Sequence, residues 1–154
     1  MLEGAARGRS FASGRGAFAK ARCAACHRLG PGGGSSGPDL TAAAGRFSRR
    51  DLLESIVLPS KVVSDQFQNT IYVRTDGTMV SGRAVREDAD TLYVKPDPLQ
   101  EAVVAIIKKD IKTFKLSPVS PMPEGLIDVL TQDEILDLIA YIQSAGKPDH
   151  PAFK

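Results

Sequence analysis

The sequence predicts a mainly α-helical domain with a small antiparallel β module inserted into it. Apolar residues recur with a helical period before residue 59 and again after residue 131. Between residues 67 and 116 the period changes to two, which is typical of half-buried strands. The chain's two cysteines lie together in the run Cys23-Ala24-Ala25-Cys26-His27, so they form one local chemical unit.

The first helix is expected from Ser13 to Cys26, with Ser13 as a possible cap and Phe18 among its apolar residues. Residues 1–12 mix Gly, Ala, Arg and Ser without a clear period and predict a flexible lead. Residues 29–38 are so rich in glycine that regular structure would be costly. We expect a loop there, of the kind that could wrap the edge of a flat ligand.

Two later helices begin at capping signals. Ser48 precedes Arg49-Arg50-Asp51, and an apolar face follows until Pro59. Thr131 and Glu134 have the spacing of a capping box, and the apolar residues after them have the helical spacing of a helix that ends near Gly146. Residues 124–130 predict a short turn before this helix.

The β module is predicted from five short β-prone runs separated by turn residues. The runs are residues 69–74, 79–86, 91–94, 103–107 and 111–115. A meander of this size predicts a strongly twisted sheet or a small open barrel, and the set resembles SH3-like or Sm-like barrels. It could be a lid or docking surface near the functional site, or a structural buttress.

These elements suggest a division of the chain. Residues 13–66 and 117–146 would form the helical domain, residues 67–116 the inserted β module, and residues 147–154 a tail.

Composition excludes several classes of protein. With 154 residues and 42% hydrophobic content, the chain suits one domain, or a small domain with an insertion. The 20 Lys and Arg against 18 Asp and Glu give a formal charge of +2, and no basic run indicates nucleic acid as a partner. No stretch approaches the roughly 20 apolar residues of a membrane span.

The cysteine motif predicts one covalent haem c. Two thiols at i and i+3 on one helical turn can both reach the vinyl groups on one edge of a porphyrin, and His27 then lies beneath the iron as its fifth ligand. A thioredoxin-like dithiol would follow a strand in a βαβ unit, and no such pattern precedes the motif. Zinc would need two further ligands, while the only other histidine is His150.

The sixth ligand of the iron has four candidates: Met122, Met79, His150, or no protein ligand. Met122 is favoured because it lies between two prolines, which can hold a thioether towards a metal at little conformational cost. Met79 lies in a predicted hairpin and His150 in a polar tail. A thioether opposite a neutral imidazole raises the reduction potential, which suits electron transfer.

Beyond this motif, the chain resembles class I, mitochondrial-type cytochromes c. The resemblance rests on Gly14 and Phe18, the CAACH motif, and the later segments Gly37–Leu40, Gly45–Arg46, Met122–Pro123 and Asp137–Ile142. With its β segment and the run Met-Pro-Glu-Gly-Leu, the chain is most similar to haem-binding domains at the ends of large secreted planctomycete and verrucomicrobial proteins.

The resemblance implies roles for individual residues. The carbonyl of Pro38 would orient the imidazole of His27, Leu40 would pack on the haem ring, and Arg46 would lie near a propionate. Phe18 and Tyr141 would form an aromatic contact between the first and last helices.

We therefore expect an electron carrier rather than an enzyme, serving a dehydrogenase domain or a separate redox partner. The alternative is a haem-based gas sensor or haem enzyme whose open distal site is shaped by the β module. Haem is attached to such motifs outside the cytoplasm, yet the first residues lack the apolar core of a secretory signal. We therefore expect a periplasmic or otherwise extracytoplasmic protein derived from a longer exported precursor.

Overall fold

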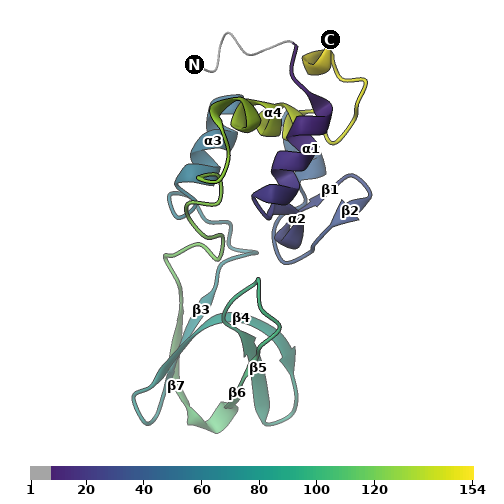
Figure 1. Ribbon diagram of the computed structural model, residues 1–154. Helices are drawn as coiled ribbons and strands as arrows, with labels where there is room; N and C mark the ends of the chain where they lie inside the picture. Colours follow the sequence, from purple (N-terminus) through teal and green to yellow (C-terminus); the bar gives the residue numbers. More distant parts are fainter. Residues whose placement is uncertain (1–7) are drawn as a thin grey trace. The chain divides into compact units, whose positions relative to one another are not determined.

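The computed structural model describes residues 8–154, which divide into two compact units (Figure 1). One unit comprises Met1–Pro59, as far as it is described, together with Pro123–Lys154, and the other is Ser60–Met122. The first unit holds the α-helices and the second a five-stranded sheet. The helical unit is therefore built from both ends of the chain. No helix in the described part is long and apolar enough to cross a membrane.

The first helix starts earlier than predicted. Helix α1 (Phe11–Lys20) is capped by Ser10, whose hydroxyl oxygen accepts a hydrogen bond from the backbone N–H of Ser13 (3.2 Å). The prediction of Ser13 as the cap was therefore wrong. The predicted flexible lead was also wrong at residues 11 and 12, which lie in α1, while residues 1–7 lie outside the described residues.

The predicted helix over residues 13–26 is broken at Arg22. This residue has a left-handed backbone (φ 59°), and the short helix α2 (Cys23–Cys26) begins directly after it. For a residue with a side chain, this conformation costs about 1–2 kcal/mol. The break starts a separate helical turn for the cysteine motif.

Helix α4 (Gln132–Gln143) packs closely across α1, and glycine permits the approach. A Cβ atom on Gly14 would collide with the carbonyl oxygen of Asp137 and lie 2.8 Å from the Cβ atom of Tyr141. The predicted aromatic contact between these helices is confirmed, since the rings of Phe18 and Tyr141 meet edge to face with centroids 5.7 Å apart.

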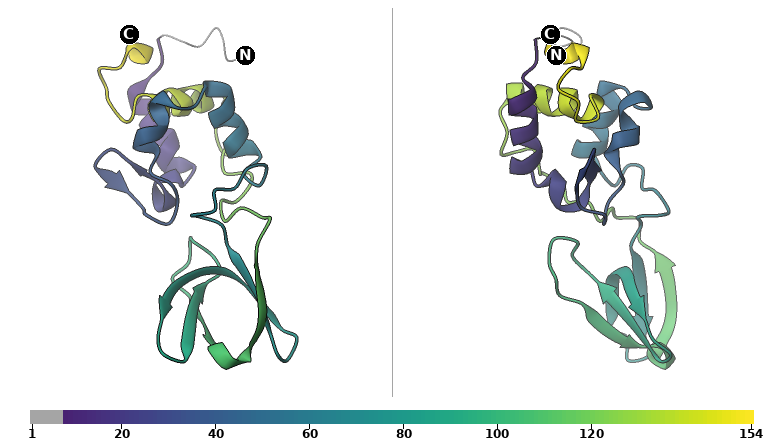
Figure 2. Two further views of the ribbon diagram at one scale, coloured as in Figure 1. Left: turned by 180° about the vertical axis from the view of Figure 1, so that it is seen from behind. Right: turned by 90° about the vertical axis from the view of Figure 1, so that its right-hand side faces the viewer.

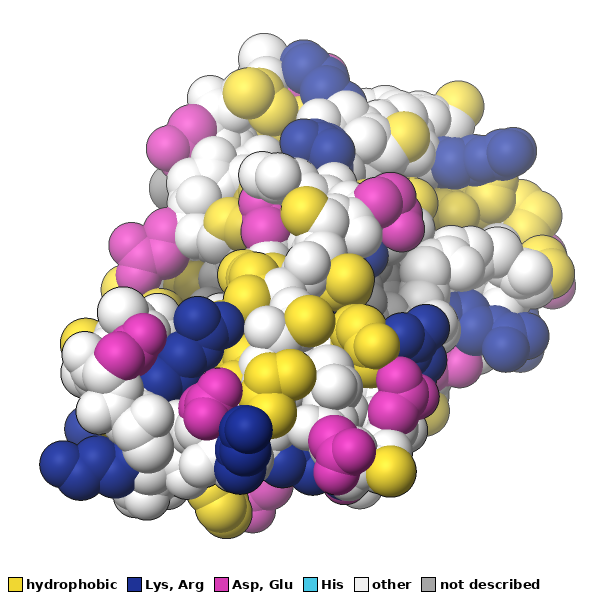
Figure 3. All heavy atoms as spheres, turned by 90° about the horizontal axis from the view of Figure 1, so that it is seen from below, with side chains coloured by type: hydrophobic (Ala, Val, Ile, Leu, Met, Phe, Trp, Pro, Cys, Tyr) yellow, Lys and Arg dark blue, Asp and Glu magenta, His cyan; other side chains and the backbone are white. Residues whose placement is uncertain are grey.

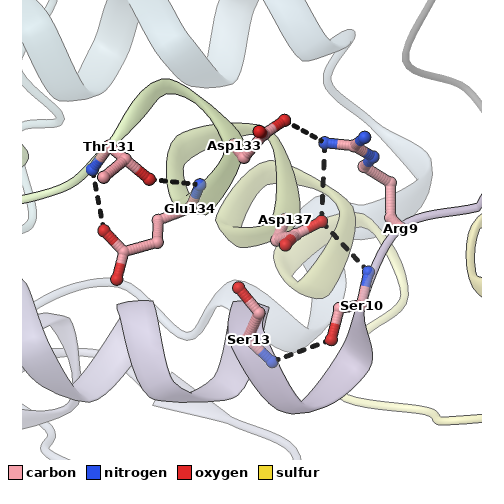
Figure 4. A network of polar contacts seen from close by, with 7 residues as sticks. All are labelled: Arg9, Ser10, Ser13, Thr131, Asp133, Glu134 and Asp137. Carbon is pink, nitrogen blue, oxygen red and sulfur yellow. Dashed lines mark hydrogen bonds and ion pairs between the residues drawn. The ribbon is translucent and has the colours of Figure 1, made fainter.

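A polar network fixes the start of α1 to α4 (Figure 4). Asp137 is only 7% exposed, and its carboxylate accepts a hydrogen bond from the backbone N–H of Ser10 (3.0 Å). The guanidinium of Arg9 lies 3.6 Å from the Asp137 carboxylate and 3.4 Å from that of Asp133. A buried carboxylate needs such partners, because an unpaired charge away from water is costly.

Both predicted capping signals are confirmed. Helix α3 (Arg49–Val57) begins with a capping box between Ser48 and Asp51, and α4 begins with one between Thr131 and Glu134. Helix α3 is linked to α4 by a hydrogen bond from Arg49 Nε to Gln143 Oε1 (2.9 Å).

Two small elements and the docking of the tail were not predicted. The glycine-rich segment forms a short hairpin of β1 (Arg28–Leu29) and β2 (Gly32–Gly33), and the 3₁₀ helix η2 (Leu40–Gly45) follows it. The C-terminal residues pack against the unit through the 3₁₀ helix η4 (Pro151–Phe153). Within it Ala152 is buried, and its carbonyl accepts a hydrogen bond from the N–H of Arg9 (3.0 Å).

Each of the five predicted β runs is a strand. They are β3 (Thr70–Arg74), β4 (Met79–Glu87), β5 (Thr91–Lys95), β6 (Val104–Ile107) and β7 (Ile111–Leu116). The sheet is antiparallel with the order β6-β5-β4-β3-β7. The last strand of the module, β7, therefore pairs with its first strand, β3. The 3₁₀ helix η3 (Lys108–Asp110) joins β6 to β7, and the sheet curls into an open barrel (Figures 1 and 2).

The β module has a hydrophobic core of its own, formed by Tyr72, Leu92, Val94 and Ile106. Its unit, Ser60–Met122, is wider than the predicted 67–116 because the flanking segments are hydrogen bonded to each other. The N–H of Ser120 donates to Ser60 Oγ (3.1 Å), and the Gln68 amide donates to the carbonyl of Ser117 (2.7 Å).

The close crossing of α1 and α4 predicts opposite effects of two alanine substitutions in one helix. Gly14→Ala should lower the free energy of unfolding by about 1–3 kcal/mol, because its methyl group overlaps the backbone of α4. Gly16→Ala is the matched control, because a Cβ atom there meets no atom within 4 Å and alanine favours helix. Guanidinium denaturation measures both free energies of unfolding; equal stabilities of the two variants would contradict the tight crossing.

Candidate functional site

The site begins with the two cysteines on the single turn of α2. Cys23 is buried and Cys26 half-buried, and both are free thiols. Because they are three positions apart in a helix, both side chains lie on the same side of the turn. Burial raises the pKa of the Cys23 thiol to about 11, so this thiol is protonated at neutral pH.

His27 follows at the end of the turn, in extended backbone conformation. Its Nδ1–H donates a hydrogen bond to the carbonyl oxygen of Pro38 at 2.8 Å, the contact that the family resemblance implied. With the proton on Nδ1, the lone pair of Nε2 is available to a metal. Burial lowers the pKa of His27, although the hydrogen bond to Pro38 opposes this effect, and the neutral ring is the form that binds metal.

The glycine-rich loop holds this arrangement through backbone hydrogen bonds. The N–H of Gly34 donates to the carbonyl of Ala24, and the N–H of Gly37 donates to the carbonyl of Cys26, both at 2.9 Å. A Cβ atom on Gly34 would collide with the carbonyl of Ala25, and one on Gly37 would lie 3.0 Å from Cε1 of His27. Glycine is therefore required at position 34, and a side chain at position 37 would crowd the His27 ring.

Both glycines contact the motif; the sequence analysis named Gly37 only through the family resemblance and did not single out Gly34. The glycine density of residues 29–38 was the available signal, but it could not identify which glycines touch the motif.

The remaining predicted residues of this unit lie at the two ends of η2. Leu40 is its first residue and is half-buried, while Arg46 is its C-cap and is exposed. Asp39 caps η2 by accepting from the N–H of Thr41 (2.8 Å), and Thr41 Oγ1 accepts from the N–H of Gly30 (2.8 Å). This last bond ties η2 to the turn between β1 and β2.

The candidates for a sixth ligand lie in different surroundings. Met122 is the last residue of the unit that contains the sheet; it is half-buried and its N–H donates to Ser120 Oγ (3.1 Å). Met79 begins β4 and is 70% exposed. The Nδ1 atom of His150 accepts from the N–H of Ala152 (3.3 Å), so this ring caps η4.

The residues present fit a covalently bound haem. Two free thiols share one helical turn, and the adjacent imidazole is neutral, oriented by a carbonyl and open at Nε2. A closed protein zinc site does not fit: across residues 8–154, no three side chains of the His, Cys, Asp and Glu types come together as metal ligands.

Comparison with family models places part of the chain in a known family. The family model described as "Cytochrome c" matches residues 11–92, which is more than half of the chain. The matched range contains α1, the cysteine motif and α3, and it ends in β5, before Met122 and α4. No curated protein matches the chain.

The tight passage of the loop over the motif predicts that Gly34→Ala hinders haem attachment. Its methyl group would push the loop away from the carbonyl of Ala25 and disturb the turn that carries both thiols. Gly32→Ala, in the same loop, meets no atom within 4 Å and should behave as wild type. The ratio of haem to protein, measured from absorbance after denaturation in alkaline pyridine, should fall for Gly34→Ala alone; equal ratios would contradict the proposed role of the loop.

Proposed function

Because this chain belongs to the cytochrome c family, we propose that it is a one-electron carrier whose haem iron is ligated by His27 and Met122. Cytochrome c domains bind haem c covalently and transfer electrons through its iron. The observation that supports the role of His27 most directly is its hydrogen bond to Pro38, which leaves Nε2 free and fixes the ring. Cys23 and Cys26 supply the two thioether sulfurs.

The support for Met122 comes from how its loop is held. Pro121 and Pro123 restrict the backbone on either side, and the N–H of Met122 is bound to Ser120. The N–H of Ser120 is itself bound to Ser60, the first residue of the same unit. A thioether in a held loop pays little conformational entropy on binding a metal. Opposite a neutral imidazole it raises the reduction potential of the iron.

In this proposal Leu40 packs on the haem ring and Arg46 contacts a propionate. Leu40 is half-buried and apolar, and Arg46 is an exposed cation, which suits a propionate at the edge of the ring. The iron changes oxidation state by one electron while both ligands stay in place. The chain itself performs no bond-making step on a substrate.

The wider setting is proposed on the same basis. The protein would act outside the cytoplasm, in the periplasm or an equivalent compartment, because haem c is attached there. Its electron donor would be a dehydrogenase domain, fused or separate. The inserted sheet and the run Met-Pro-Glu-Gly-Leu support placing it with the planctomycete and verrucomicrobial haem-binding domains.

Met122→Ala tests the ligand set. The ferric haem-loaded protein should lose the weak far-red absorption band of sulfur-ligated iron, and the ferrous form should gain carbon monoxide binding, because one coordination position opens. Met79→Ala is the matched control, since this side chain is 70% exposed on β4 and should leave both spectra unchanged.

Two results would contradict the assignment. A far-red band that persists in Met122→Ala would exclude Met122 as the ligand. A high-spin spectrum in the unaltered protein, with carbon monoxide binding already present, would instead indicate a gas sensor or haem enzyme with an open distal site.

A further inference from the structure

Strand β7 is an edge strand with a free side. It is the terminal strand of the order β6-β5-β4-β3-β7 and pairs only with β3. Within the described part of the chain, no strand pairs with its other side. Such an edge presents unpaired N–H and C=O groups and is a template for another extended chain.

The backbone hydrogen bonds show which groups face this free side. The N–H of Ser117 donates to the carbonyl of Asn69 (2.8 Å), so these two opposed residues form a hydrogen-bonded pair. In an antiparallel ladder, pairs with and without mutual hydrogen bonds alternate. Because Phe114 is opposite Tyr72 and Leu116 is opposite Thr70, the N–H and C=O groups of Phe114 and Leu116 point away from β3.

The side chains at this edge are unusually apolar for an exposed strand. Phe114 is 70% exposed and Leu116 is 55% exposed. The ring of Phe114 lies beside that of Tyr72, with centroids 6.4 Å apart, so it stands on the concave face of the sheet. A second strand on this edge would cover both side chains.

A cavity opens on the same face. It has a volume of about 670 Å³. Its apolar lining is Tyr72, Leu92, Ile111 and Phe114, and its polar lining is Thr70, Glu87, Lys108, Lys112 and Thr113, with Glu87 paired to Lys108. Figure 3 shows one end of the β module, where hydrophobic side chains gather in the middle with basic and acidic side chains around them. The cavity has the size of a ligand pocket, and its apolar part can receive apolar side chains.

The charge of the segment indicates the partner. Residues 108–116 contain four lysines and one acid, Asp110. Lys108 is paired with Glu87 at 2.6 Å, and the other three, Lys109, Lys112 and Lys115, lie along η3 and β7. Lysines on an edge oppose pairing with a second copy of the same strand, because like charges would face each other. The same lysines favour an acidic strand.

We propose that the free edge of β7 binds an extended, acidic segment of a partner protein as a sixth strand of the sheet. The segment's backbone pairs with Phe114 and Leu116, its apolar side chains enter the cavity beside Tyr72, and its carboxylates lie near the lysines. Successive side chains of a strand point to opposite faces, so one peptide can place apolar side chains in the cavity and carboxylates near the lysines.

The first experiment uses the haem-loaded protein and a peptide of about ten residues in which glutamate and valine alternate. Backbone amide NMR should show the largest shifts at Phe114 and Leu116, with slowed hydrogen exchange of both amides, and binding should weaken as salt is added. A peptide of the same length with alternating lysine and valine should bind at least about tenfold more weakly. Equal binding of the two peptides, or binding of neither, overturns the proposal.

Two substitutions at one position separate backbone pairing from side-chain contact. Leu116→Pro removes an N–H that points away from β3, so the sheet keeps its own hydrogen bonds, while Leu116→Ala keeps this N–H. Proline should weaken peptide binding roughly fivefold or more relative to alanine, the effect of one hydrogen bond. Thermal unfolding of both variants checks that the module is folded. If folded Leu116→Pro binds as tightly as Leu116→Ala, no strand is added at β7.

Two further results would replace the acidic peptide by another partner. Sedimentation of the unaltered protein as an oligomer that Leu116→Pro dissociates would assign the edge to a second copy. Displacement of the acidic peptide by a single-stranded oligonucleotide would assign it to nucleic acid. A monomer that ignores the oligonucleotide supports the proposal.

Discussion

The crossing of α1 and α4 at Gly14 is the contact on which the rest of the helical unit depends. The unit is made from the two ends of the chain, and this crossing joins them. Helix α1 leads directly into the turn with both cysteines, and α4 holds α3 through Gln143. The buried carboxylate of Asp137 adds a polar constraint at the same place, because it binds the N–H that begins α1. The cysteine motif is thus placed by residues more than a hundred positions away.

The features that could be predicted from the sequence are those determined by residues close together in the chain. The capping boxes at Ser48 and Thr131 depend on residues three positions apart, and the five strands on an alternation within each run. The errors arise where a contact with a residue far away in the sequence determines the structure. Ser10 rather than Ser13 begins α1 because Asp137 binds its N–H, and the tail is docked because Ala152 pairs with Arg9. The sequence around Ser10 does not indicate Asp137, and the sequence around Ala152 does not indicate Arg9.

The same division applies to the site. The spacing of Cys23, Cys26 and His27 is local, and it was sufficient to predict the chemistry of the motif. The contact between Pro38 and His27 came only from the family resemblance, because it depends on how an irregular loop returns. Gly37 was named only through the family resemblance, and Gly34 could not be distinguished from its neighbours, since its need for glycine arises from the backbone of Ala25 that it approaches. Met122 differs, because the prolines on either side of it are visible in the sequence, while its role as a ligand is a proposal.

The β module is an insertion whose ends are held to each other by its own flanking residues. A hydrogen bond from Ser120 to Ser60 joins the two ends of its unit, so the chain enters and leaves the insertion at nearby points. Closing a loop costs little more entropy as the loop grows, and the module also has its own core around Val94. The match to the family model ends in β5, before α4, although α4 belongs to the helical unit. No residue of the free, basic edge of β7 belongs to the cysteine motif, so the partner proposed for that edge and the proposed haem use different residues.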